Sequence, residues 1–394
     1  MKGSIRQITV SGGDSWVNTG DEAILTATLH LFREINPNIL IRIVSGNGNK
    51  TETQFPDYEV VDRRNIFRFI KAIRKTDLYV WGGGHLIQNT SSKLFLIYHY
   101  FLLSLVIVHR VNLVGFCLGV EPINGKFWRR VTRLILNKFS FISVRDENSK
   151  KILDELQVAT PIFVSSDPAV ILSPDKDLNP ELQELQYQPY VVLSPRKWFD
   201  YHSSLFPVKF YRQFSSADNE RYLQTINVFG KVCDWIVDNL GFRIIFIPMY
   251  IENEQSDDFV ATKIVEQMKR KEMTHIVKKQ YPPQQLINFI QGAQFLIGMR
   301  MHSTILGACA RVPIVGLYYQ KKGESFFSAL NLEDYSIPVE DFSLERMIRI
   351  IETIGPKKDS LIKEINTNMG SLKIKIKKNM DILSKEILNY DEKL

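Results

Sequence analysis

The chain has 394 residues, of which 44% are hydrophobic and 24% are charged, and its formal net charge is +7. This length is sufficient for two domains of ordinary size, and the hydrophobic fraction excludes an intrinsically disordered chain. Cys117, Cys233 and Cys309 lie far apart in apolar segments and match no metal-binding spacing, which indicates small core residues in a cytoplasmic protein. Residues 1–4 lead directly into a predicted strand, so we expect no signal peptide.

The first half of the chain alternates short apolar runs with helical patterns. This alternation is typical of a parallel sheet that is covered by helices on both faces. We therefore expect an N-terminal Rossmann-like domain over residues 1–172, on the probable acceptor side. Its predicted strands are 5–10, 39–44, 78–81, 111–116 and 141–144, and its predicted helices lie near 21–35, 64–75, 93–108, 128–138 and 147–156.

A second α/β unit is predicted after an irregular linker, residues 173–189, which is rich in Pro, Asp, Glu and Gln. We expect a C-terminal Rossmann-like domain over 190–355, on the probable donor side, and a basic helical tail over 356–394. Residues 197–217 are irregular and contain several aromatic side chains, which makes them a candidate flap. The predicted strands are 190–193, 242–247, 295–298 and 313–317, and the predicted helices lie near 219–240, 257–271, 283–291, 303–310 and 323–330.

Two segments bear on membrane contact. The apolar run 94–108 is shorter than a typical membrane span and is interrupted by His99 and Ser104, which predicts a buried or half-buried helix. Seven lysines cluster between residues 357 and 378, with isoleucines among them, as in a solvated helix or in a surface for anionic lipid or glycan. No recognisable nucleic-acid-binding fold is present, so we expect no nucleic-acid partner.

The most informative segment is Gly298-Met299-Arg300-Met301-His302-Ser303, which joins a predicted strand to a predicted helix. In an α/β fold ligands bind at this edge, and the N–H groups of a helix start favour an anion. Arg300 offers a fork of donors for phosphate or carboxylate, and His302 can exchange a proton near neutral pH. The alternative is that Arg300 pairs with a structural carboxylate and that His302 caps the helix.

Three further loops follow predicted strands. In the first, Asp21 and Glu22 open a helix whose dipole favours carboxylates. In the second, three glycines, residues 82–84, predict a cradle of N–H groups for an anion or a sugar oxygen, with His85 at its mouth. Arg196 follows a strand of the second half, and two arginines with a histidine suit a small dianion. The chain has neither a GxGxxG fingerprint nor a P-loop lysine, and no metal-binding constellation.

Together these motifs resemble the polysaccharide pyruvyl transferase family. The resemblance covers roughly residues 5–330, and its motifs occur in the order found in the family. The residues that carry it are Asn18-Thr19-Gly20-Asp21-Glu22-Ala23-Ile24, Gly82-Gly83-Gly84, Ser143-Val144-Arg145-Asp146, Asp167-Pro168-Ala169, Arg196 and Gly298-Met299-Arg300-Met301-His302.

The resemblance implies a GT-B-like fold and an enzyme that moves the enolpyruvyl group of phosphoenolpyruvate onto two hydroxyls of a sugar, forming a pyruvate ketal. It implies phosphoenolpyruvate as donor substrate, no cofactor, and a catalytic pair, Arg300 and His302. It also suggests a polyprenol-linked oligosaccharide of a cell-surface polysaccharide as acceptor, and hence a cytoplasmic protein at the inner face of the membrane.

The resemblance and the position of these residues at strand ends together suggest a role for each candidate residue. We expect His302 to be the base on the attacking hydroxyl, and the C3 proton to come from His85, Asp21 or Glu22. The expected donor-binding residues are Arg196, Arg300 and Ser303. The expected acceptor-binding residues are Asn18, Asp21, Glu22, Gly83, Gly84 and His85.

Two other functions are weighed against this one. A GT-B glycosyltransferase with a nucleotide-sugar donor would share the fold and the basic cleft, but no glutamate clearly placed to hold a ribose is evident. A non-catalytic glycan-binding or assembly protein is a second alternative, and intact Arg196, Arg300 and His302 argue against it.

Overall fold

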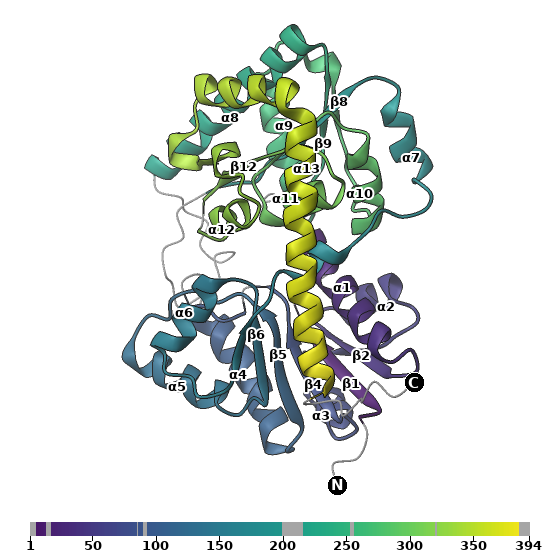
Figure 1. Cartoon of the computed structure of the whole chain (residues 1–394), viewed down its shortest axis with the longest axis vertical. Helices are drawn as coiled ribbons and strands as arrows, with labels where there is room; N and C mark the ends of the chain where they lie inside the picture. Colours follow the sequence, from purple (N-terminus) through teal and green to yellow (C-terminus); the bar gives the residue numbers. More distant parts are fainter. Residues whose placement is uncertain are drawn as a thin grey trace.

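A computed structural model of the protein describes residues 5–12, 17–84, 86–89, 93–198, 216–252, 256–319 and 321–385. Two parallel sheets, of seven and six strands, form two domains that are stacked along the long axis of the molecule (Figure 1). The expected α/β architecture with two Rossmann-like halves is therefore confirmed. Most of the candidate flap, residues 199–215, lies outside the described residues, as does His85.

The N-terminal sheet has the strand order β3-β2-β1-β4-β5-β6-β7. Sheet growth reverses direction between β1 and β4, and ligands bind at such a switch point, beyond the carboxyl ends of the strands. The strands are β1 (Gln7–Ser11), β2 (Leu40–Ser45), β3 (Glu59–Asp62), β4 (Leu78–Gly82), β5 (Asn112–Leu118), β6 (Phe141–Val144) and β7 (Ile162–Val164).

Helices cover both faces of this sheet because successive strand residues point to opposite sides and both sides are apolar. The long helix α1 packs on one face, while α3 to α6 pack on the other. The helices are α1 (Thr19–Ile35), α2 (Gly48–Gln54), α3 (Ile66–Ile73), α4 (Lys93–Val108), α5 (Lys126–Leu136), α6 (Glu147–Glu155) and the 3-10 turn η1 (Pro168–Ile171).

The C-terminal sheet repeats this topology with the order β10-β9-β8-β11-β12-β13, so its switch point lies between β8 and β11. Its strands are β8 (Tyr190–Ser194), β9 (Arg243–Phe246), β10 (Thr274–Ile276), β11 (Leu296–Gly298), β12 (Ile314–Tyr318) and β13 (Ser336–Pro338). The remaining helices are α7 (Pro180–Gln183), α8 (Ser216–Leu240), α9 (Asp257–Gln267), α10 (Pro283–Gln291), α11 (Met301–Cys309), α12 (Lys321–Ala329) and α13 (Leu344–Leu383), with 3-10 turns η2 (Glu184–Gln186), η4 (Lys271–Met273), η5 (Glu333–Tyr335) and η6 (Val339–Asp341).

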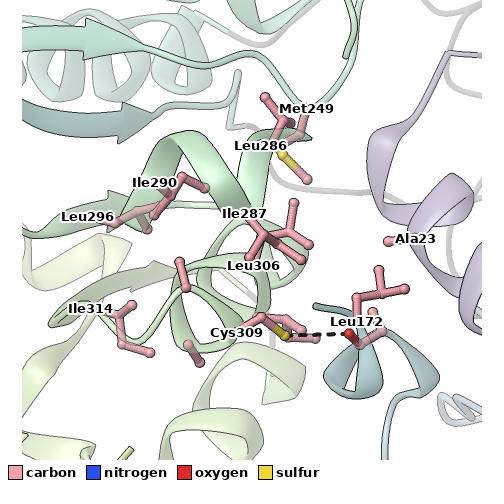
Figure 2. Close-up of a cluster of buried hydrophobic side chains, with 14 of the residues drawn as sticks. Ala23, Leu172, Met249, Leu286, Ile287, Ile290, Leu296, Leu306, Cys309 and Ile314 are labelled. Atoms are coloured by element: carbon pink, nitrogen blue, oxygen red, sulfur yellow. Dashed lines mark hydrogen bonds between the residues drawn. The ribbon is translucent and has the colours of Figure 1, made fainter. Parts of the chain in front are cut away.

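A shared apolar contact joins the two domains. Ala23 of α1 and Leu172, which follows η1, lie opposite Leu306 and Cys309 of α11 (Figure 2), and all four side chains are buried. The Sγ atom of Cys309 lies 3.5 Å from the carbonyl oxygen of Ala169. The domains therefore share a continuous core at this junction.

The helix α13 crosses from the C-terminal domain to the N-terminal domain (yellow in Figure 1) and continues through Pro356. Its core-facing side chains beyond that proline, such as Leu361 and Ile376, are buried. Asn379 of α13 also donates from Nδ2 to the carbonyl oxygen of Val164, at 3.1 Å. The basic tail expected from residue 356 is thus, through residue 385, part of a structural helix that contributes to the core of both domains.

This packing changes the interpretation of the lysine cluster. Lys373, Lys375, Lys377 and Lys378 are exposed, as is Ile374 at 57%, whereas Ile376 among them is buried, so this part of α13 is amphipathic. A truncation after residue 355 would remove core side chains as well as lysines. The expected boundary between residues 355 and 356 falls inside this helix.

The apolar run 94–108 forms α4, and the prediction of a half-buried helix is confirmed. Leu96 and Val106 are fully buried against the sheet, whereas Phe101 is 48% exposed and Val108 is 74% exposed. Across the described ranges, no helix has both the length and the apolar character that are needed to span a membrane.

Candidate active site

Two arginines emerge from neighbouring strands at one edge of the C-terminal sheet. In the parallel register Gly298 of β11 lies beside Ser194 of β8, and the N–H group of Met299 donates to the carbonyl oxygen of Ser194 at 3.0 Å. Arg300 and Arg196 each stand two residues beyond this pair. The structure therefore brings both arginines to the switch point of the second domain, where the sequence placed them.

A buried carboxylate holds the Arg300 guanidinium. Nε donates to Oδ2 of Asp257 at 2.7 Å, and Nη2 donates to Oδ1 at 2.8 Å. Asp257 is fully buried at the start of α9 and also accepts the N–H group of Met249 at 3.0 Å. This two-bond arrangement fixes the plane of the guanidinium. Arg300 therefore does pair with a buried carboxylate, as the alternative interpretation of the sequence expected. The sequence did not identify Asp257 as this partner.

The Arg196 side chain lies against an aromatic ring. Its guanidinium carbon is 4.8 Å from the ring centroid of Tyr319, and Nη1 donates to the hydroxyl of that tyrosine. Tyr319 follows β12, whereas Asp257 lies beyond β9, so Arg196 and Arg300 extend to opposite sides of the β8–β11 edge. The two guanidinium groups flank the start of α11 instead of meeting at one point.

His302 projects from the first turn of α11 into the N-terminal domain. Its Nε2 atom lies 3.4 Å from Oδ2 of Asp167, which is the N-cap residue of η1. On another side the ring packs against Gly20 of α1, where an added Cβ would lie 2.3 Å from Nδ1. The N-cap residue of α11 is Arg300. His302 therefore contacts the other domain instead of capping its own helix.

Asp167 connects His302 to a third arginine. Nη1 of Arg145 lies 3.4 Å from Oδ2 of Asp167, and both side chains are almost completely buried. Burial alone would raise the pKa of Asp167, but His302, Arg145 and the N–H group of Ala169 together hold that pKa below its ordinary value. Arg145 directly follows β6, as Arg196 and Arg300 follow β8 and β11. This shared strand-end position could have identified Arg145 from the sequence.

Asn18 organises the first turn of α1 and the contact between domains. Its Oδ1 accepts the N–H group of Gly20 at 3.0 Å, and its Nδ2 donates to Asp21 at 3.1 Å. The same segment pairs with the other domain, since the N–H group of Thr19 donates to the carbonyl oxygen of Met249 at 2.9 Å. Asn18 thus has two structural roles. It caps the N-terminus of α1, and its backbone forms an antiparallel bridge with Tyr250 of the other domain.

Glu22 is a buried carboxyl at the domain interface. It is only 6% exposed, and its Oε2 accepts from Nε2 of Gln280 at 3.1 Å and from Nε2 of Gln54 at 3.4 Å. Burial raises the pKa of Glu22 to about 8, although the hydrogen bond from Gln280 opposes this shift. A substantial fraction of Glu22 therefore carries its proton at neutral pH.

The triple-glycine turn packs against α1 and β5. Gly83 and Gly84 have φ angles of 72° and 74°, a conformation that glycine adopts without strain. A Cβ on Gly83 would lie 2.0 Å from Cγ2 of Ile24, so the turn also needs the missing side chain. The N–H group of Gly83 donates to the carbonyl oxygen of Phe116 at 3.1 Å, so it is not directed at a ligand as the predicted cradle of N–H groups requires. Gly84 nevertheless lies close to Asp21, whose Oδ1 is 3.8 Å from the position that a Cβ on Gly84 would occupy.

The donor groups of Ser303 are used within its own helix. Its hydroxyl donates to the carbonyl oxygen of Arg300 at 2.7 Å, and its N–H group donates to the same oxygen at 3.0 Å. Binding of the donor substrate by Ser303 stays a prediction. The two hydrogen bonds to Arg300 argue against it, because they already use both donors of Ser303.

A cavity of about 470 Å³ lies between the domains beside the Asp167 cluster. Residues from both domains line it, including Arg145, Asp167, Met301 and Phe326. Its position adjoins the His302–Asp167 pair, although Arg196 and Arg300 do not line it. Among the described residues, no group of three or more His, Cys, Asp or Glu side chains could hold a metal ion.

The protein has a two-domain GT-B-like fold with its candidate groups at the domain junction. UDP-N-acetylglucosamine 2-epimerase from Neisseria meningitidis, bound to UDP-GlcNAc, is similar in structure, with a TM-score of 0.60 and 12% identity over 96% of this chain and 100% of that one. A glycosyltransferase from Rickettsia africae has a TM-score of 0.56 and 12% identity over 97% and 98% of the two chains. Because these identities are low, these similarities establish the GT-B-like fold alone.

The chain belongs to the polysaccharide pyruvyl transferase family, whose family model matches residues 18–321. It is also 18% identical over 312 residues to the amylovoran biosynthesis protein AmsJ of Erwinia amylovora, which covers 78% of this chain and 71% of that protein. The predicted family and the predicted enzyme class, a transferase, are confirmed.

The Gly20–His302 contact gives a first prediction. In Gly20→Ala the new methyl group would overlap the imidazole, which can yield only by leaving its position beside Asp167. We expect a turnover that is lower by at least about tenfold, because small displacements of reacting groups are costly. Gly370→Ala is the control, since a Cβ there meets nothing within 4 Å. Wild-type turnover of Gly20→Ala would contradict this role of the contact.

The buried Glu22 gives a prediction about pH. The folded state binds this proton more tightly than the unfolded state, so the resulting stabilisation is complete below about pH 4.5 and is lost as the pH rises through about 8. Glu22→Gln removes this titration. Urea unfolding measures the free energy of unfolding of both proteins. The difference between the wild type and Glu22→Gln should shift against the wild type by a few kcal/mol as the pH rises from acidic to alkaline.

The control for this measurement is Glu155→Gln, at an exposed position of α6 in the same domain. Its stability relative to the wild type gives the background for the comparison. A difference for Glu22→Gln that does not change with pH would show that folding does not raise the pKa of Glu22.

Proposed function

We propose that this protein transfers the enolpyruvyl group of phosphoenolpyruvate to two hydroxyls of one sugar, in a cell-surface polysaccharide or its lipid-linked precursor. The observation that carries the proposal is the position of His302. This side chain starts from the switch-point edge of one domain and lies between Gly20 and Asp167 of the other. Residues of the separate family motifs thus meet at one place.

Phosphoenolpyruvate carries a phosphate and a carboxylate on one carbon, and each group suits a cationic partner. Arg196 and Arg300 follow the neighbouring strands β8 and β11, and each guanidinium can donate to one of these groups. Asp257 uses Nε and Nη2 of Arg300 and holds its plane, so Arg300 is oriented before the donor arrives. On this basis both arginines are proposed to bind the donor substrate.

The reaction forms two C–O bonds at C2 of the donor and breaks one C–O bond to phosphate. Protonation at C3 converts the CH₂ group to a methyl group and makes C2 electrophilic, so that the first sugar hydroxyl adds there. Phosphate then leaves, and the second hydroxyl closes the ketal. Of the two hydroxyl protons, one balances the proton delivered to C3 and the other leaves with phosphate.

His302 is the proposed base for the attacking hydroxyl. Asp167 is ionised and lies 3.4 Å from Nε2, so it stabilises the positive charge that the imidazole gains when it accepts a proton. Arg145 binds the other side of the same carboxylate and keeps it in place. Asp167 and Arg145 are therefore proposed as positioning residues for His302.

Glu22 is the proposed acid for C3. It lies on the same helix turn as Gly20, and its pKa of about 8 keeps a transferable proton available at neutral pH. Asp21, the other described candidate, is bonded to Asn18 and lies beside Gly84, which suits contact with a sugar hydroxyl. Asn18, Asp21, Gly83 and Gly84 therefore belong to the proposed acceptor side, to which His85 was also assigned.

A thermal-shift comparison separates this function from the nucleotide-sugar alternative. Phosphoenolpyruvate should raise the melting temperature of the protein, while UDP-sugars at equal concentration should not. Stabilisation by a UDP-sugar together with no response to phosphoenolpyruvate would identify a glycosyltransferase instead. No response to either donor class, with binding of glycans alone, would favour the non-catalytic alternative.

The arginines give a prediction about donor affinity. Arg196→Ala should weaken phosphoenolpyruvate binding by on the order of 2–4 kcal/mol, because it removes a charge-assisted contact to a desolvated anion. Arg196→Lys should recover only part of this loss, since a lysine cannot form the planar fork. Titration calorimetry measures both, and Arg68→Ala on the exposed face of α3 is the control. Unchanged affinity in Arg196→Ala would remove Arg196 from the donor site.

Arg300 requires a different substitution, because Arg300→Ala would leave the buried Asp257 without its counter-charge and destabilise the fold. Arg300→Lys retains the charge but loses the two-bond geometry. We expect weaker binding of phosphoenolpyruvate in this variant at a melting temperature near that of the wild type. Unaltered donor affinity would assign Arg300 a structural role alone.

The histidine gives a prediction about turnover. His302→Gln should retain phosphoenolpyruvate affinity and the fold but lower kcat by a factor of about 100 or more, the scale of general acid–base catalysis. Phosphate release in the presence of acceptor reports kcat, and His275→Gln at an exposed position is the control. A collapse of the melting temperature in His302→Gln alone would show instead that His302 serves the domain interface.

A further inference from the structure

The positive charge of this chain is concentrated in one segment of the N-terminal domain. Residues 63–141 contain 13 lysines and arginines but only two acidic residues, Asp77 and Glu121. The whole chain has 50 basic and 43 acidic residues, so the residues outside this segment carry a slight excess of acidic groups. This segment includes α3, α4 and α5, which pack on the same face of the sheet.

The central helix of this layer, α4, is apolar on its outer side as well as on its inner side. Leu94, Ile97, Phe101 and Val108 are 39%, 40%, 48% and 74% exposed. Their spacing of three, four and seven residues places them in one stripe along the helix. Since other side chains of α4 fill the core, the outer stripe is not needed for packing in this chain.

The neighbouring helices extend this apolar stripe. Phe67 on α3 is 88% exposed, and Phe127 and Leu134 on α5 are 67% and 56% exposed. The three helices are adjacent, because the hydroxyl of Tyr100 on α4 donates to Thr132 on α5 at 2.8 Å, and a second tyrosine of α4 donates to the backbone just before α3. Seven of the thirteen large exposed hydrophobic side chains of the described residues lie on these three helices.

Two of these helices, α3 and α5, also carry exposed basic side chains. Arg68, Lys71 and Arg74 on α3 and Lys126 and Arg130 on α5 are all exposed. We call this surface the α3–α5 face and define it by Phe67, Arg68, Lys71, Arg74, Leu94, Ile97, Phe101, Val108, Lys126, Phe127, Arg130 and Leu134.

The chemistry of the α3–α5 face selects among partners. A second copy of the same face would bring like charges together, which opposes a symmetric dimer. Nucleic acid would use the basic groups but would leave the aliphatic stripe in water. The interface of an anionic bilayer satisfies both, since phosphate groups attract the basic side chains and the acyl boundary accepts the apolar ones.

We propose that the α3–α5 face docks on the surface of an anionic lipid bilayer and that α13 does not. The α3–α5 face carries seven exposed large apolar side chains together with excess positive charge, whereas the α13 lysine cluster carries one, Ile374, because Ile376 is buried. The docking helix α4 is connected to β4, whose carboxyl end lies at the switch point of the N-terminal domain. Docking would therefore place the acceptor side of the molecule near the lipid headgroups.

Vesicle flotation of the full-length protein tests this assignment. Vesicles of phosphatidylglycerol and phosphatidylcholine are compared with vesicles of phosphatidylcholine alone, at low and at high salt. Two double variants remove the two kinds of group separately: Phe101→Glu with Val108→Glu, and Arg68→Glu with Arg130→Glu. Their matched controls are Leu223→Glu on α8, which is 55% exposed, and Lys377→Glu with Lys378→Glu on α13.

The wild type should float with anionic vesicles at low salt and be released at high salt. Each double variant on the α3–α5 face should partition at least about tenfold less, because each basic residue near the surface contributes ~1 kcal/mol and an inserted carboxylate opposes burial. Both controls should match the wild type. All variants should keep the wild-type melting temperature, because the altered side chains are exposed.

Three outcomes would overturn the proposal. The wild type could fail to float with anionic vesicles at low salt, or the α13 variant could lose binding while the α3–α5 variants retain it. Sedimentation velocity without lipid could also show a dimer that the α3–α5 variants dissociate, which would make the face a protein interface. Flotation does not depend on catalysis, so this experiment tests membrane docking separately from the proposed transfer reaction.

Discussion

The active arrangement proposed for this protein depends on one close contact between its domains. The His302 ring, carried by the C-terminal domain, lies where a side chain on Gly20 of the N-terminal domain would be, and it faces the ionised Asp167. Neither domain contains this arrangement alone. In the proposed mechanism the chemistry takes place where the carboxyl edges of the two parallel sheets meet, which is where such folds bind ligands.

Several independent features hold the domains in this position. Apolar side chains of α1, η1 and α11 share one core, and α13 extends that core along both domains. A backbone bridge joins residues 17–19 to 249–251, and the Asp257 carboxylate binds both the N–H group of Met249 and the guanidinium of Arg300. The orientation of Arg300 is thus connected through one carboxylate to the strand that bridges the domains. A movement of the domains would alter the histidine and the arginine together.

The sequence predicted the fold well where strong periodicity was present. The long helices and the central strands were found, because continuous apolar runs mark strands that are buried on both faces. The short strands β3, β7, β10 and β13 were missed, since three or four residues at a sheet edge carry little pattern. Strand-end reasoning found Arg196, Arg300 and His302, but not Asp257, whose role requires knowing that the start of α9 lies within reach of the Arg300 side chain. The core-facing side of the helical tail was not recognised, because its buried side chains alternate with exposed lysines.

Mass spectrometry of the product tests the central claim most directly. The protein is incubated in D₂O with phosphoenolpyruvate and a panel of diol-bearing glycans, and released phosphate is measured in parallel. The account predicts one pyruvate ketal per phosphate released, with one deuterium in the methyl group from the proton delivered to C3. A glycosylated product from a nucleotide sugar, or phosphate release without any ketal on a glycan that binds, would contradict it.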